Sequence, residues 1–103
     1  MPRVSVNPKQ IAAALKRAER ALKPDVVRIR YTLRDDWTGD PSIYFKVVLS
    51  DDAASKESKL NEITERIEFT IGEKVKADDL GLNSYFNFRS LSEQNEVNDP
   101  AWA

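Results

Sequence analysis

Two runs of alternating apolar and polar residues in the middle of the chain predict two β-strands, because successive side chains of a strand point to opposite faces of a sheet. The apolar positions of the first run are Val27, Ile29, Tyr31 and Leu33, and those of the second are Ile43, Phe45, Val47 and Leu49. Residues 35–41 lie between the runs and are rich in Asp, Gly and Pro, which favour turns. The pattern therefore predicts a hairpin over residues 26–50.

The apolar positions also predict how the two strands pair, because a shift by one residue would turn one apolar set to the wrong face of the sheet. The simplest set of expected pairs is Leu33 with Ile43, Tyr31 with Phe45, Ile29 with Val47 and Val27 with Leu49. On the other face, this register places Arg30 opposite Lys46. Like charges directly opposite each other are destabilising, so a bound anion would turn this repulsion into attraction.

Apolar residues that recur at intervals of three and four predict a helix on each side of the hairpin. Their positions are Ile11, Ala14, Leu15, Ala18 and Leu22 in the first helix, and Leu60, Ile63, Ile67 and Ile71 in the second. Asn7 and Pro8 fit the N-cap and the first position of the first helix. Phe69 points away from the apolar stripe of the second helix. We expect it either to be covered by the C-terminal tail or to contact a partner.

Residues 85–90 alternate at a period of two and are rich in aromatic residues, which predicts a last strand. The order is then α-β-β-α-β, an α+β fold with two helices packed on one face of a small antiparallel sheet. If Val4–Val6 also forms a strand, the order becomes β-α-β-β-α-β, which resembles the ferredoxin-like arrangement. We expect one domain over residues 1–91 and a polar, mobile tail over residues 92–103, with Trp102 either docked on the body or disordered.

The chain of 103 residues contains no cysteine and no histidine. Catalysis by Cys–His or Ser–His–Asp, Cys/His zinc sites and haem ligation through His or Cys are therefore excluded. The carboxylates of Asp35, Asp36 and Asp40 could offer oxygen ligands to a hard cation, but their spacing does not match an EF-hand loop. An exposed hairpin tip also lacks the pocket that would separate their pKa values for acid–base catalysis. We expect no enzyme, no metal site and no cofactor.

Charge is distributed unevenly along the chain, although the formal net charge is only -1. Residues 1–34 carry nine Lys and Arg residues against two Asp and Glu, whereas residues 35–103 carry seven against fifteen. This asymmetry predicts either a basic surface for an acidic partner, or two halves that neutralise each other within one molecule or across a dimer. Because no run of about 18 apolar residues occurs, we expect a cytoplasmic protein without a membrane segment.

The polar face of the hairpin is the strongest candidate binding surface. Its residues are Arg28, Arg30, Arg34, Tyr44 and Lys46. Cationic and aromatic side chains on an open sheet can neutralise phosphates and stack on bases, but a solvated face or a face covered by a partner sheet would carry the same residues. Our first hypothesis is a non-catalytic interaction module that self-associates or regulates another protein, with Phe69 as a further contact. The alternative is binding of single-stranded RNA or another nucleic acid through the basic face.

Overall fold

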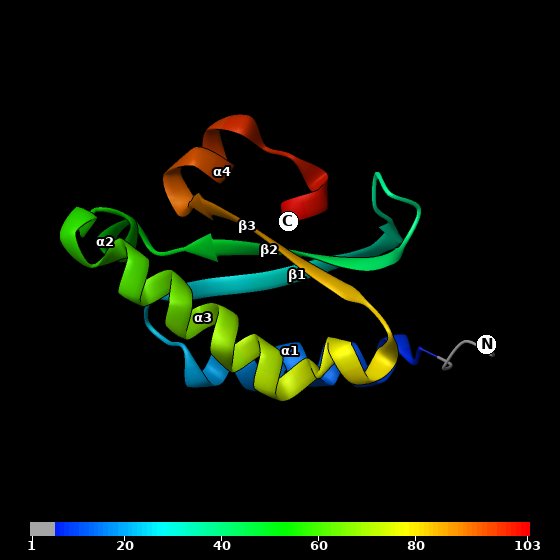
Figure 1. Ribbon diagram of the computed structural model, residues 1–103. Helices are drawn as coiled ribbons and strands as arrows, with labels where there is room; N and C mark the ends of the chain where they lie inside the picture. Colours follow the sequence, from blue (N-terminus) through cyan, green and yellow to red (C-terminus); the bar gives the residue numbers. More distant parts are fainter. Residues whose placement is uncertain (1–5) are drawn as a thin grey trace.

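The computed structural model describes residues 6–103, which form a three-stranded sheet with helices on both faces (Figure 1). Its longer elements are α1 (Pro8–Ala21), β1 (Val26–Asp35), β2 (Pro41–Leu49), α3 (Leu60–Val75), β3 (Asn83–Ser90) and α4 (Leu91–Val97). Its shorter helical segments are α2 (Asp51–Ala54), η1 (Glu57–Lys59), η2 (Ala77–Leu80) and η3 (Pro100–Trp102). Helices α1 and α3 pack against each other on one face of the sheet, and α4 lies on the other face. The α+β class with two helices on one face is thus confirmed.

The sheet is mixed rather than antiparallel. Strands β1 and β2 pair antiparallel, as expected for a hairpin, but β2 and β3 pair in parallel, with Phe45 opposite Phe86. The crossover from Ser50 to Leu82 causes this difference, because α3 carries the chain back along the sheet before β3 begins. In a split β-α-β arrangement another strand would lie between the two parallel strands, whereas β2 and β3 pair directly. Most of the strand expected at Val4–Val6 lies outside the described residues, and Val6 itself is not in a strand.

The predicted hairpin register is confirmed from Ile29 onward, including the Arg30–Lys46 pair. At the start of β1 the prediction is wrong by one residue, because a bulge makes Val26 the partner of Leu49. Val26 is only 2% exposed, whereas Val27 is 39% exposed. Two consecutive valines fit either register, so the sequence pattern alone could not show which of them is buried.

One apolar core lies between the sheet and helices α1 and α3. Its largest fully buried side chains include Phe45, Leu22, Ile43, Ile67 and Ile71. The apolar stripe predicted for the second helix is buried in α3, apart from Leu60, which is partly buried. Phe69, which points away from this stripe, is 69% exposed. Within residues 6–103, the helices fall short of the length and apolarity that a membrane-spanning helix requires.

The chain after β3 is folded, whereas the sequence led us to expect a mobile tail. Helix α4 begins with a capping box, in which the Ser90 hydroxyl accepts from the Glu93 N–H and the Glu93 carboxylate accepts from the Ser90 N–H. Trp102 is 6% exposed, and its segment η3 contacts β1 and β2. Docking of Trp102 on the body is therefore confirmed. The polar composition of this segment gave no apolar pattern from which to predict a helix. Only two of its residues, Gln94 and Trp102, are buried.

Candidate functional site

The face of the sheet opposite α1 and α3, here called the second face, carries the whole predicted basic surface. Strand β1 contributes the three arginines, and β2 contributes Tyr44 and Lys46. Strand β3 adds Tyr85 and Arg89, which lie opposite Tyr44 and Val48 in the parallel register. The alternation of the last strand predicts that Arg89 points away from the core, but neither residue was part of the predicted surface, because the side chains that they meet depend on which strand β3 pairs with.

The C-terminal segment covers one half of the second face through hydrogen bonds to two of the predicted arginines. Arg28 Nε donates to the main-chain oxygen of Trp102 at 2.8 Å. Arg30 Nε donates to the main-chain oxygen of Ala103 at 2.7 Å. These guanidinium groups are therefore already engaged by the chain itself.

Arg89 of β3 holds the same segment in place. Its guanidinium carbon lies 4.4 Å from the centroid of the Trp102 ring, and its Nη1 donates to Gln94 Oε1 at 3.0 Å. Nη1 also lies 3.6 Å from Asp99 Oδ2. Val48 lies on the second face and is fully buried. We call the surface of Arg28, Arg30, Val48 and Arg89 the covered half.

The like-charge pair predicted from the register exists, but its two members have separate partners. Arg30 Nη1 lies 3.6 Å from Glu19 Oε2, at the edge of the sheet. Lys46 Nζ donates to Thr32 Oγ1 at 2.8 Å. Burial lowers the pKa of Lys46 from its ordinary value, and the charge of Arg34 lowers it further. The like charge that lowers the pKa of Lys46 is therefore that of Arg34, and not that of Arg30.

The other half of the second face carries a row of stacked side chains that the C-terminal segment leaves uncovered. Arg34 Cζ lies 4.3 Å from the centroid of the Tyr44 ring. The rings of Tyr44 and Tyr85 stack at 5.0 Å with 19° between their planes, and Trp37 follows at 5.5 Å from Tyr85. Trp37 is 81% exposed. We call the surface of Arg34, Trp37, Tyr44, Lys46 and Tyr85 the uncovered half.

Asp36 fixes the hairpin loop and Tyr85 of this row. Its Oδ1 accepts hydrogen bonds from Thr38 Oγ1 at 2.6 Å and from the N–H groups of Thr38 and Asp40, and its Oδ2 accepts from the Tyr85 hydroxyl at 2.8 Å. The bonds from Thr38 and Tyr85 hold the pKa of Asp36 well below its ordinary range. In turn, the bond to Asp36 raises the pKa of Tyr85 to about 12. Asp36 therefore anchors the loop.

The loop carboxylates that we considered as oxygen ligands for a cation thus have other roles in the structure. Both Asp36 oxygens are occupied by protein donors, and Asp35 is exposed. Within residues 6–103, no three acidic side chains are grouped so that they could hold a metal ion.

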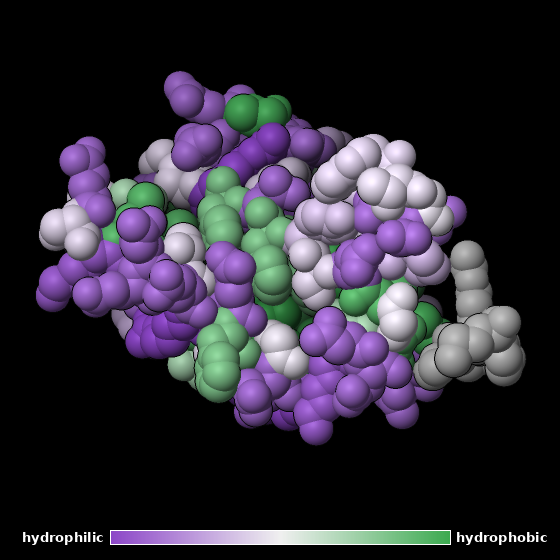
Figure 2. Space-filling view, viewed as in Figure 1, coloured by the Kyte–Doolittle hydropathy of each residue, from purple (hydrophilic) through white to green (hydrophobic). Residues whose placement is uncertain are grey.

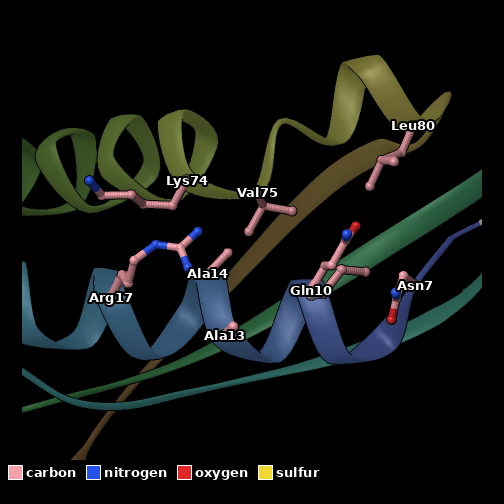
Figure 3. Close-up of a pocket in the computed structure, with 9 residues that line it drawn as sticks. Asn7, Gln10, Ala13, Ala14, Arg17, Lys74, Val75 and Leu80 are labelled. Carbon is pink, nitrogen blue, oxygen red and sulfur yellow. The ribbon is translucent and has the colours of Figure 1, made fainter.

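A groove of about 340 Å³ between α1 and the end of α3 is a second candidate site (Figure 3). Its apolar lining includes Ala14, Val75 and Leu80, and its charged residues are Arg17 and Lys74. Figure 3 shows that Lys74 extends back along α3, away from the middle of the groove. Ligand pockets place a few polar groups around one point. This groove lacks that convergence.

Phe69 is an isolated exposed ring on α3. Its exposure of 69% shows that the C-terminal segment, which lies on the second face, does not cover it. Figure 2 shows apolar surface along β3 on this side of the molecule, bordered by hydrophilic surface and by surface of intermediate hydropathy. Phe86 and Phe88 of β3 are partly buried against the core. Single exposed apolar residues are common on protein surfaces, so Phe69 is a weaker candidate contact than the uncovered half.

Comparisons with known proteins give no assignment: no family model matches the chain, and no curated protein or solved structure matches it significantly. The second face is therefore the strongest indication of function. Its uncovered half offers two tyrosine rings and two cations on the sheet, and an exposed indole on the hairpin loop. Such a surface can bind through aromatic contacts and charge-assisted hydrogen bonds.

Proposed function

We propose that the chain is a non-catalytic protein-interaction module that contacts its partner through the uncovered half of the second face. The observation that carries the proposal is the row of Arg34, Tyr44, Tyr85 and Trp37, which the chain's own C-terminal segment leaves open. Trp, Tyr and Arg are the residue types that contribute most to binding energy at protein interfaces. Strands and the Asp36 hydrogen bonds hold this row in place, so binding requires little additional ordering.

The partner we propose presents a carboxylate next to an apolar side chain. Arg34 and Lys46 lie on neighbouring strands. Burial lowers the pKa of Lys46, and repulsion by the charge of Arg34 lowers it further. A partner carboxylate between them would relieve that repulsion and accept charge-assisted hydrogen bonds. Trp37, at the other end of the row, offers apolar area to the neighbouring side chain.

The same geometry supports single-stranded nucleic acid less well. Proteins bind unpaired bases by stacking them on open ring faces. Arg34 and Tyr85 come from strands on opposite sides of β2, so they occupy both faces of the Tyr44 ring. Arg28 and Arg30 donate to the C-terminal segment, which leaves fewer cations for phosphates. These contacts favour a protein partner.

Photocrosslinking tests the proposal. Asn87 is exposed on the second face, opposite Lys46, so a photoreactive amino acid there lies beside the row without replacing any of its members. We expect a crosslinked protein from position 87 and none from position 69 on α3, the matched control. The purified partner should then bind Trp37→Ala at least about tenfold more weakly than wild type, and should bind Phe69→Ala as wild type. Equal crosslinking from both positions, or unchanged binding by Trp37→Ala, would overturn the proposal.

Fluorescence anisotropy with labelled single-stranded RNA at two salt concentrations tests the alternative. We expect no binding by wild type at low salt. If wild type binds, the double variant Arg34→Glu with Lys46→Glu decides between the two functions. A fall in the log-log salt slope of about 0.7 for each lost phosphate contact would assign the uncovered half to nucleic acid.

A further inference from the structure

We propose that two copies of the chain join edge to edge through β1, so that their two sheets become one continuous sheet. This inference goes beyond the proposed function, because it uses the backbone edge of β1 rather than the uncovered half. It gives a location to the self-association that our first hypothesis and the charge asymmetry led us to expect. Within the part of the chain that the structure describes, some outward backbone groups of β1 already have hydrogen-bond partners, and others do not.

Side chains cap the first part of the β1 edge. The N–H of Ile29 donates to Glu19 Oε2 at 2.7 Å, and its carbonyl oxygen accepts from Arg30 Nη1 at 3.0 Å. Strand β1 is at the edge of the sheet, so such outward groups have no neighbouring strand. Capping by side chains protects Ile29 from pairing with another chain.

The second part of the β1 edge is uncapped. Along an antiparallel strand, residues whose N–H and C=O groups point toward the paired strand alternate with residues whose groups point away from it. The N–H and C=O groups of Ile29 point away from β2, so the same is expected of Tyr31, Leu33 and Asp35. Among residues 6–103, no hydrogen bond of a side chain or a loop reaches the backbone of these three residues. We call residues 31–35 the open edge.

Within residues 6–103, neither the hairpin loop nor α1 covers the open edge. The hairpin loop leans away from β1, toward β3 at the opposite edge of the sheet. Asp36 accepts a hydrogen bond from the Tyr85 hydroxyl, and Trp37 packs beside the same ring. The Tyr31 hydroxyl donates to the main-chain oxygen of Pro8, where α1 begins, so the helical layer ends at this point. Leu33 lies beyond it and is 38% exposed, although it belongs to the apolar face of the hairpin. It borders a hollow of about 240 Å³.

A second copy fits the open edge because the segment is complementary to itself. In an antiparallel pair with a two-fold axis at Leu33, each Leu33 faces the other, Thr32 faces Arg34 and Tyr31 faces Asp35. No like charges then stand opposite each other, and the two exposed leucines bury one another. A pairing of this length makes a small interface, so we expect a dimer that forms in the micromolar range.

The axis of such a pair is perpendicular to the sheet, which places the same face of both copies on the same side. Two uncovered halves would then lie on one surface of the dimer. A partner that carries two matching sites would gain from simultaneous contact with both copies.

Introducing a charge at Leu33 tests the dimer by analytical ultracentrifugation from low to high micromolar concentration. We expect wild type to dimerise, and Leu33→Lys and Leu33→Glu each to remain monomeric, because like charges would then face each other across the axis. An equimolar mixture of the two variants should dimerise again. A monomeric wild type, variants that dimerise as wild type does, or a mixture that stays monomeric would overturn the proposal.

Amide hydrogen exchange tests the same contact without a substitution. The amides of Tyr31 and Leu33 should exchange more slowly as the protein concentration rises. The Ile29 amide, which already donates to Glu19, is the internal control and should not change. Exchange at Tyr31 and Leu33 that is independent of concentration would contradict the pairing. Neither experiment depends on the photocrosslinking result, so the dimer and the interaction surface can fail separately.

Discussion

The covered and uncovered halves of the second face are built from the same residue types, but the chain uses them differently. In the covered half, Arg28 and Arg89 hold Trp102, which is 6% exposed. In the uncovered half, Arg34 stacks on Tyr44, and the row ends at Trp37, which is 81% exposed. Arginine and aromatic residues on a sheet therefore do not by themselves mark a binding surface. What distinguishes the two halves is whether the chain's own segments occupy them.

Replacing the two tryptophans should give the largest contrast between the halves. Trp102→Ala should lower the free energy of unfolding by about 3–5 kcal/mol, because it removes a buried indole that packs against the sheet. Trp37→Ala should lower it by less than about 1 kcal/mol, because the exposed ring packs mainly against Tyr85. Urea denaturation followed by circular dichroism measures both losses. Equal losses would mean that the C-terminal segment is not part of the stable fold.

Alkaline pH should weaken the anchor of the uncovered half. The hydrogen bond to Asp36 raises the pKa of Tyr85 from 10.0 to about 12, so the stability from this bond is complete below pH 10 and is lost as the pH rises toward 12. Tyr85→Phe lacks this bond, so its stability deficit relative to wild type should be constant from about pH 6 to pH 10, where Asp36 is ionised in both the folded and unfolded states, and should shrink above pH 10. Urea denaturation across this pH range checks the prediction. A deficit that does not change with pH would contradict it.

The two arginine–aromatic pairs should show the smallest contrast. Their distances are nearly equal, at 4.3 Å for Arg34 over Tyr44 and 4.4 Å for Arg89 over Trp102. Such contacts stabilise more when they are shielded from water, and Arg89 is partly buried whereas Arg34 is exposed. Arg89→Ala should therefore cost about 1–2 kcal/mol and Arg34→Ala about 0.5 kcal/mol in the same denaturation assay. The reverse order would show that burial does not separate the two halves.

Local patterns in the sequence predicted the elements whose contacts are close along the chain. The alternation in the hairpin determined its register, and the Asn7–Pro8 start and the apolar spacing determined α1. The direction of β3 could not be predicted in this way, because it depends on the path of the crossover rather than on the composition of residues 83–90. The C-terminal helix did have a local signal, the capping box of Ser90 and Glu93, which its polar composition obscured.

The candidate site was predictable only in part, for the same reason. Arg34, Tyr44 and Lys46 could be placed on one face, because strand alternation alone decides this. The row itself requires Tyr85, which reaches Tyr44 through the pairing of β2 with β3, and Trp37, which the loop brings over from the hairpin. Contacts between segments so far apart in the sequence do not produce a periodic pattern of residues from which they could be predicted.

The direct pairing of β2 with β3 also decides which strand is vulnerable while the chain folds. Strand β2 is almost completely buried in the folded protein, and it is rich in β-branched and aromatic residues. The hairpin can form between neighbours in sequence, but β3 arrives only after the loop from Ser50 to Leu82 has closed. Until then β2 is an apolar edge that can template aggregation. The speed of that closure therefore sets how concentrated a refolding chain can be before intermolecular association competes with folding.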